Sequence, residues 1–337
     1  MKRLRAQALA ATAVAFAASL ISAPALACSS CGCTLSSDWD SHGFTTHSGW
    51  KLDLRYDYLN QDQLRSGTGT ISPGAASQIV TGTGNQEVEK FTRNQYYSAA
   101  IDYSGSPSWG ISLQIPYIDR THRTLGTASD GYTPATGGGQ YDSSTSSLGD
   151  VKLTGHYQGF LPRHNFGIQL GFKLPTGSHT RMGTSTDPAN PGGVPIDRGL
   201  QPGTGTTDGI LGAYYFDSLS RDWDYFIQAI AQLALNSSDG YKPGNGYNLN
   251  LGVRYMGMTS AFPQLQVNAR HVEHDTGDNA DQISTGGTLI YLSPGLVVPV
   301  TRLTSIYGFV QLPLYQDVRG VQLAPRYSAS IGARFSF

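Results

Sequence analysis

The sequence predicts an all-β protein, a transmembrane antiparallel up-and-down β-barrel of about 12 strands. Three observations lead to this fold class. Apolar and polar residues alternate with a period of two over many segments, which is the pattern of strands with two chemically different faces. Only 14% of the residues are charged, against about 25% in an average soluble domain. The links between strands are alternately short and long, as in barrels of the bacterial outer membrane.

Residues 1–27 have the pattern of a signal peptide. A cationic start is followed by a short apolar stretch and by a small-x-small cleavage site at 25–27. Retention of 6–23 as an N-terminal anchor is the alternative. We therefore divide the chain into a signal peptide at 1–27, a Cys-rich N-terminal periplasmic or plug segment at 28–48, and an outer-membrane β-barrel at 49–337. The expected location is the cell outer membrane.

The cysteines Cys28, Cys31 and Cys33 begin the segment after the leader, with His42 and His47 downstream. Export to an oxidising compartment favours a disulfide that leaves one thiol over. Thiolates beside imidazoles also suit Cu(I) or Zn(II), so a metal site is a second interpretation. A lipidated Cys28 and a reactive thiol are two more. Apart from this copper or zinc, we expect no cofactor, and covalent c-type haem is not predicted because the sequence has no Cys-x-x-Cys-His motif.

Strands are expected from residue 50 onward. Residues 50–58 and 109–117 alternate apolar with mainly polar side chains, and further strands start near residues 95, 151, 166, 210, 225, 247, 264, 288 and 305. The last strand, 326–337, alternates throughout and ends on Phe337. A terminal aromatic residue is the feature that the barrel-assembly machinery of outer membranes reads. That machinery and outer-membrane lipid are therefore expected partners, and nucleic acid is not, because the net charge is only −1.

The lengths of the links favour a barrel over a soluble sandwich. Short links are expected near 104–108, 161–165, 218–222, 259–263 and 299–302. Longer polar links are expected near 61–87, 123–147, 178–205, 236–246, 275–287 and 316–323. An even-stranded barrel with both termini in the periplasm has this alternation of short turns and long loops. Closure also pairs every strand edge, as lipid requires.

Aromatic residues near the strand ends support the membrane assignment. One group is expected near the short turns: Trp50, Tyr103, Trp109, Phe166 and Tyr225. A second group is expected near the long loops: Tyr56, Tyr58, Tyr97, Tyr117 and Tyr247. Two such belts around an apolar band are the girdles of a membrane barrel. The alternative is a secreted β-sandwich or propeller, but soluble strands place their charges on the outside, whereas these charges fall on the internal face.

The internal face is expected to carry the function. It holds nine cations, namely Lys51, Arg55, Arg120, Lys152, Lys173, Arg254, Arg270, Arg326 and Arg334. It holds four anions, namely Asp53, Asp57, Asp102 and Asp150. A basic lumen would concentrate anionic solutes. The alternative is that these charges pair with one another to fill a narrow barrel.

Several other inward positions are candidate solute contacts. His156 falls on the internal face, and Tyr307, Phe309, Gln311 and Tyr315 share one face of their segment. An aromatic stripe suits an aromatic solute, although it can equally serve packing. Prolines within strands predict bends or bulges.

Five segments resemble the outer-membrane transporter family named for the meta-pathway of phenol degradation. They are LGDVKL (148–153), KLPTG (173–177), QPGTGTTD (201–208), LSPGL (292–296) and VQLPLYQ (310–316). The resemblance implies a barrel and the uptake of small, often aromatic, compounds, and it brings no catalytic residue.

We therefore expect an outer-membrane channel for passive uptake or efflux of small solutes, with aromatic or anionic compounds as candidates. The main alternative is a copper- or zinc-binding or redox-partner port that uses the N-terminal cysteines. We do not expect an enzyme. A lipase-like barrel would need Ser and His within hydrogen-bond reach, and no G-x-S-x-G motif is present.

Overall fold

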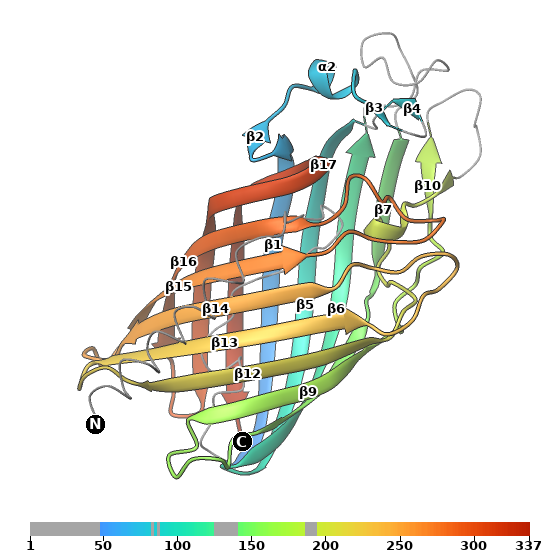
Figure 1. The fold of residues 1–337 in the computed structure, drawn as a ribbon. Helices are drawn as coiled ribbons and strands as arrows, with labels where there is room; N and C mark the ends of the chain where they lie inside the picture. Colours follow the sequence, from blue (N-terminus) through green and yellow to red (C-terminus); the bar gives the residue numbers. More distant parts are fainter. Residues whose placement is uncertain (1–47, 82–83, 86–87, 125–140, 186–193) are drawn as a thin grey trace, which may run out of the picture.

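The strands close into a tilted antiparallel barrel with almost no helix (Figure 1), as the sequence predicts. This computed structural model describes residues 48–81, 84–85, 88–124, 141–185 and 194–337. The predicted signal peptide and the segment with Cys28, Cys31, Cys33, His42 and His47 lie outside these residues. The interpretations of that segment therefore stay predictions.

Eleven labelled strands form the closed ring, each antiparallel to its neighbours. In order they are β6 (Trp109–Thr124), β5 (Glu89–Ser106), β1 (Gly49–Gly67), β17 (Thr304–Ser336), β16 (Gly287–Pro299), β15 (Phe262–Val272), β14 (Gly246–Tyr255), β13 (Trp223–Ala234), β12 (Asp208–Ser218), β9 (Phe166–Leu174) and β8 (Val151–Tyr157). The pairing of β8 with β6 closes the ring. Closure leaves the lipid-facing wall without a free strand edge, which the membrane core demands.

Strand β17 crosses the barrel twice. Its first arm pairs with β16 and its second arm pairs with β1. Between them the chain reverses at Gly320, whose φ of +60° suits a residue without a side chain. Counted as two spans, β17 brings the ring to the predicted number of about 12. The long loop expected at 316–323 is wrong, because both arms stay in strand up to a tight turn.

One wall of the barrel is interrupted. Strands β7 (Tyr141–Leu148) and β8 both pair with β6, and the chain leaves the ladder between them at Gly149 and Asp150. Strand β10 (Met182–Ser185) continues the sheet from β7 and pairs in turn with β11 (Val194–Pro195). The short elements β2 (Gly69–Thr70), α2 (Pro73–Ala76), β3 (Val80–Thr81) and β4 (Gly84–Asn85) follow β1 at the long-loop end (Figure 1).

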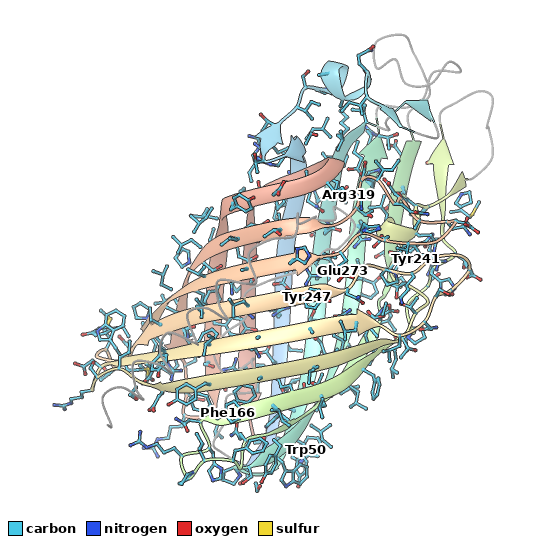
Figure 2. All side chains as sticks on the ribbon, viewed as in Figure 1. Trp50, Phe166, Tyr241, Tyr247, Glu273 and Arg319 are labelled. Atoms are coloured by element: carbon cyan, nitrogen blue, oxygen red, sulfur yellow. The ribbon has the colours of Figure 1, made fainter. Side chains whose placement is uncertain are left out.

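Apolar side chains cover the outside of the ring between two aromatic belts. At the short-turn end, the Trp50 ring lies 4.7 Å from Tyr103 and the Tyr103 ring lies 6.1 Å from Trp109. At the other end, Tyr97 lies 5.1 Å from Tyr56 and 6.4 Å from Tyr117. Figure 2 shows Trp50 and Phe166 at the first end and Tyr247 toward the second. Leucine, isoleucine and valine side chains between the belts are exposed.

These features are those of a bacterial outer-membrane barrel, and they confirm the predicted fold class and location. In the described part of the chain, none of the helices is long and apolar enough to cross a membrane. The strands provide the membrane-spanning surface.

Large rings fill the interior near the short turns, which we call the periplasmic end. Phe226 is buried on β13 with Tyr214 of β12, and Tyr307 and Phe309 are buried on β17 with Val297 of β16. Each of the four rings lies against a glycine, which belongs to a neighbouring strand or, for Tyr307, to the second arm of β17. The core of this barrel is therefore an aromatic floor at its periplasmic end.

Two inward assignments are wrong. Arg326 is 63% exposed and pairs with Asp62 at 3.2 Å, because the register between β1 and β17 shifts next to it. Tyr315 is 42% exposed, because a bulge in the β16–β17 ladder reverses the alternation after Pro313. Each bulge inserts a residue, so the side chains beyond it change faces.

Candidate functional site: the solute path inside the barrel

Midway along four neighbouring strands of the described wall, a run of inward side chains is accessible to water. On β5 the inward residues are buried at Tyr96, accessible over the next three inward positions, and buried again at Ser104. Strands β6, β8 and β9 repeat this pattern at matching heights. We call these side chains the accessible band: Ser98, Ala100, Asp102, Ser112, Gln114, Pro116, Lys152, Thr154, His156 and Gln169. A solute in the lumen can therefore contact the wall along this band.

Two of the predicted cations lie at this band: Lys152 belongs to it and Lys51 borders it. Lys51 of β1 is opposite Asp102 in the ladder, and Lys152 of β8 is opposite Gln114. Lys51 is near enough to Asp102 and His156 to act electrostatically on both. The His156 ring covers Gly110, where a Cβ would lie 2.5 Å from it. The predicted residues Lys51, Lys152 and His156 thus meet in one region of the lumen.

Other predicted cations lie in ion pairs within the wall. Arg334 pairs with Asp53 at 3.3 Å, and the Tyr307 hydroxyl donates to the same carboxylate at 2.7 Å. Arg55 pairs with Asp57 at 2.8 Å. These pairs join neighbouring inward positions of β1 and β17, so each cation has its counter-charge at contact distance.

Arg254 and Arg270 line the opposite wall, on β14 and β15. Arg254 pairs with Asp224 at 3.0 Å, and Arg270 donates to Asn248 at 3.0 Å. Between them runs a ladder of buried amides. Asn268 donates to Asn250 at 3.0 Å, and Asn250 donates to Gln228 at 3.1 Å.

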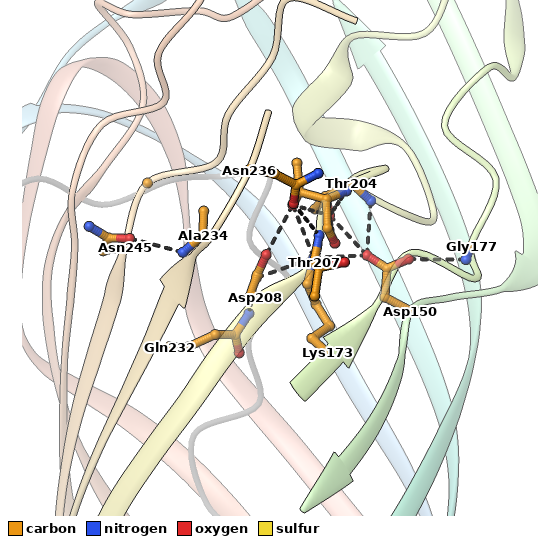
Figure 3. A network of polar contacts seen from close by, with 12 residues as sticks. Asp150, Lys173, Gly177, Thr204, Thr207, Asp208, Gln232, Ala234, Asn236 and Asn245 are labelled. Atoms are coloured by element: carbon orange, nitrogen blue, oxygen red, sulfur yellow. Dashed lines mark hydrogen bonds and ion pairs between the residues drawn. The ribbon is translucent and has the colours of Figure 1, made fainter. Parts of the chain in front are cut away.

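Lys173 is buried between two carboxylates at the interrupted wall (Figure 3). Its Nζ lies 3.0 Å from Asp150 and 3.2 Å from Asp208. Asp150 also accepts from the backbone N–H groups of Gly177 and Thr204, both at 3.0 Å. Donors from two loops therefore satisfy one carboxylate, and the lysine fixes the ends of β8, β9 and β12 to one another.

Arg120 binds the loop that leads to Thr204. Its Nη1 donates to the carbonyl oxygens of Gly199 and Gln201, both at 3.4 Å, and its Nη2 donates to the Tyr96 hydroxyl at 3.0 Å. We call residues 196–207 the strap. It contains the short 3₁₀ helix η2 (Arg198–Leu200) with buried Ile196 and Leu200. The strap therefore crosses the inside of the barrel beyond the accessible band, on its extracellular side.

Tyr307 and Phe309 are 1% and 2% exposed and pack with Val297. They belong to the aromatic floor rather than to the accessible band. Their place is set by burial against the glycines, a constraint that the period-two pattern of one strand does not contain.

Sequence reasoning missed two inward carboxylates, Asp208 and Asp224. With these two added and Arg326 removed, the predicted set becomes eight cations against six carboxylates. The excess of cations is therefore much smaller than the nine against four expected from the sequence. The signal was available, because Asp208 and Asp224 share the parity of the inward residues of their strands.

The extracellular loops meet at a buried carboxylate, Asp275. It accepts from the Tyr241 hydroxyl at 3.0 Å and from the Gly244 N–H at 2.9 Å. The pKa of Asp275 is raised to about 6, mainly by burial and also by the nearby charges of Asp197 and Asp281, while these two hydrogen bonds lower it. Among the residues that the structure describes, no group of three or more His, Cys, Asp or Glu side chains is arranged to hold a metal ion.

Comparisons with known proteins agree on the architecture. No family model matches the chain, and none of the curated proteins matches it. Among solved structures, an outer membrane channel from Pseudomonas putida F1 is similar with a TM-score of 0.61 and 14% identity, over 90% of this chain and all (100%) of the other.

Weaker similarities extend to two further channels. A deltaS2 mutant of the TodX monoaromatic hydrocarbon channel has a TM-score of 0.48 at 10% identity, covering 86% of this chain and 91% of that one. The toluene transporter TbuX from Ralstonia pickettii has a TM-score of 0.43 at 11% identity, covering 86% and 90%. At such identities the first similarity supports the fold alone.

Proposed function

We propose that the chain is a passive outer-membrane channel for small solutes, with aromatic or anionic compounds as candidates. The accessible band carries this proposal, because it is a water-accessible stretch of inward side chains inside a closed barrel. Small residues such as Ser98, Ala100 and Ser112 leave room along this side of the lumen, whereas long side chains fill the opposite wall. The described interior offers polar contacts and no catalytic arrangement that we recognise.

The resemblance to the phenol meta-pathway transporter family supports the same proposal. Three of its five segments, 148–153, 173–177 and 201–208, meet in the network around Lys173 (Figure 3). Segments far apart in the chain thus form one structural unit, which explains why they occur together. On this basis we infer that the chain belongs to that family and that its solutes are small, often aromatic, compounds.

Liposome swelling with a small neutral sugar tests the proposal. Purified protein is expected to raise the swelling rate, and Ser112→Trp is expected to lower it by filling the band. Ile111→Trp is the matched control, because Ile111 is the preceding residue on the lipid-facing side. Wild-type protein that folds but gives no swelling with any small solute would contradict the channel.

A further inference from the structure

We propose that the strap is the gate of this channel, and that the loop between β13 and β14 (235–245) holds it closed through Arg198 and Tyr241. This inference rests on the proposed channel and adds its regulation. The path opens and closes at the extracellular end of the accessible band, without a change in the strands of the wall.

The strap lies directly at that end of the band. On β6, Pro116 is the last residue of the band, and the next inward residues, Ile118 and Arg120, are buried. A Cβ at Gly149 would lie 3.2 Å from the Pro116 ring and 3.2 Å from the carbonyl oxygen of Pro202 in the strap. Arg120 donates to two further carbonyl oxygens of the strap. The accessible stretch of β6 therefore ends where the strap begins.

Two parts of the strap are held in different ways. Residues 204–207 are fixed to the wall, because Thr204 donates to Asp150 through its N–H at 3.0 Å and through its hydroxyl at 2.9 Å (Figure 3). We call residues 196–202, which include η2, the arm. Gly203 joins the arm to the fixed part, and its lack of a side chain gives the backbone the freedom to turn there.

The arm is also held from the extracellular loops. The Arg198 guanidinium donates to Ser238 O at 3.1 Å and lies 5.0 Å from the centre of the Tyr241 ring. The Tyr241 hydroxyl in turn donates to Asp275 at 3.0 Å. Both Tyr241 and Asp275 are buried. One arginine thus connects the arm to a loop junction whose own position is fixed.

The closed position leaves one polar atom of this arginine unsatisfied. Among the residues that the structure describes, the buried Nε of Arg198 has no hydrogen-bond partner. A buried donor without a partner costs free energy, which is recovered when the side chain returns to water. The closed and open positions are therefore closer in free energy than with a fully satisfied latch, as a two-state gate requires.

Single-channel recording in planar bilayers tests the gate. Arg198→Gln and Tyr241→Leu are each expected to raise the ratio of open to closed time by about tenfold, because each removes a contact of the charged guanidinium. Arg326→Gln is the matched control, since Arg326 lies on the outer surface and pairs with Asp62. Its gating is expected to match that of wild type.

Hydrogen exchange shows whether the arm itself has moved. The Ile196 N–H donates to Arg181 O at 3.0 Å, and the Arg181 N–H donates to the Gln201 side chain at 3.0 Å. Both amides are expected to exchange faster in Arg198→Gln, whereas the Thr204 N–H at the wall keeps its wild-type rate. This pattern distinguishes a released arm from general loss of structure.

Two outcomes would overturn the gate. Faster exchange of the arm with unchanged gating would show that the strap does not close the path. Unchanged exchange in Arg198→Gln would show that the loop does not hold the arm. Either result leaves the channel standing. Folded wild-type protein that conducts no ion and no small solute would instead contradict the channel itself.

Discussion

At the scale of single residues, paired glycines and aromatic rings shape the floor of the barrel. A Cβ at Gly295 would lie 2.1 Å from the Phe309 ring, and one at Gly252 would lie 2.2 Å from the Phe226 ring. The ring needs the space that the missing side chain leaves, and it covers backbone that would otherwise be exposed. The sequence placed Tyr307 and Phe309 inside but not their glycine partners, since these are set by register between strands.

Gly295→Ala is therefore expected to destabilise the barrel by about 1 to 3 kcal/mol, the usual cost of overpacking. The free energy of unfolding in lipid vesicles, measured by urea titration, checks this. Gly308→Ala is the control, because its Cβ would meet only Ser330 O at 3.5 Å, an ordinary contact. Equal loss of stability in both variants would contradict a specific role for the ring.

At the scale of elements, charged side chains hold the strap in place. The pattern of each strand identifies these residues one at a time, but it does not show that they contact one another. Lys173 and Asp208 are opposite each other in the β9–β12 ladder, but Asp150 reaches the same lysine from the interruption between β7 and β8. Strand period and turn lengths predict nearly every span, because they are local properties. Bulges, the strap and the wall break depend on contacts between distant segments, so no local pattern contains them.

Lys173→Met should release the strap. The change leaves two buried carboxylates without their cation, a loss of about 3 to 5 kcal/mol in a buried pair. The Gly203 and Thr204 amides donate to Ser178 O at 2.9 Å and to Asp150 at 3.0 Å, and their hydrogen exchange is expected to accelerate. Arg254→Met breaks a different pair far from the strap, and unchanged exchange of these two amides is expected there.

The extracellular loop junction should respond to pH through Asp275. Its pKa in the folded protein is about 6, above the ordinary value of 3.8, with burial as the main cause. The folded state therefore binds the proton more tightly than the unfolded loop does, and the junction loses stability as pH rises from about 4 through 6. Exchange of the Gly244 amide is expected to be slower at pH 5 than at pH 8, beyond the intrinsic rate. In Asp275→Asn this extra difference should disappear.

At the scale of the whole molecule, closure and the outward surface were predictable because membrane insertion imposes them on every strand. Alternation, girdles and the last strand all follow from lipid on one side and a lumen on the other. The function within the lumen was less predictable. The inward parity of Lys51 and Lys152 could be read from the sequence, but the accessible band appears only when four strands are aligned and the strap and floor are in place.

The predicted recognition of the terminal ring by the assembly machinery can be separated from a structural role of Phe337. Phe337 is 75% exposed, and its backbone N–H donates to Trp50 O at 2.9 Å where the first and last strands meet. Because the side chain packs little, Phe337→Ser is expected to change the unfolding free energy by less than about 0.5 kcal/mol. If the assembly machinery reads this ring, the variant should nevertheless accumulate several times less in the outer membrane of living cells. Tyr327→Ser, at an exposed outward position of the same arm, serves as the control. Normal outer-membrane levels of Phe337→Ser would show that the ring is not the assembly signal, whereas a large loss of stability in vitro would assign it a structural role instead.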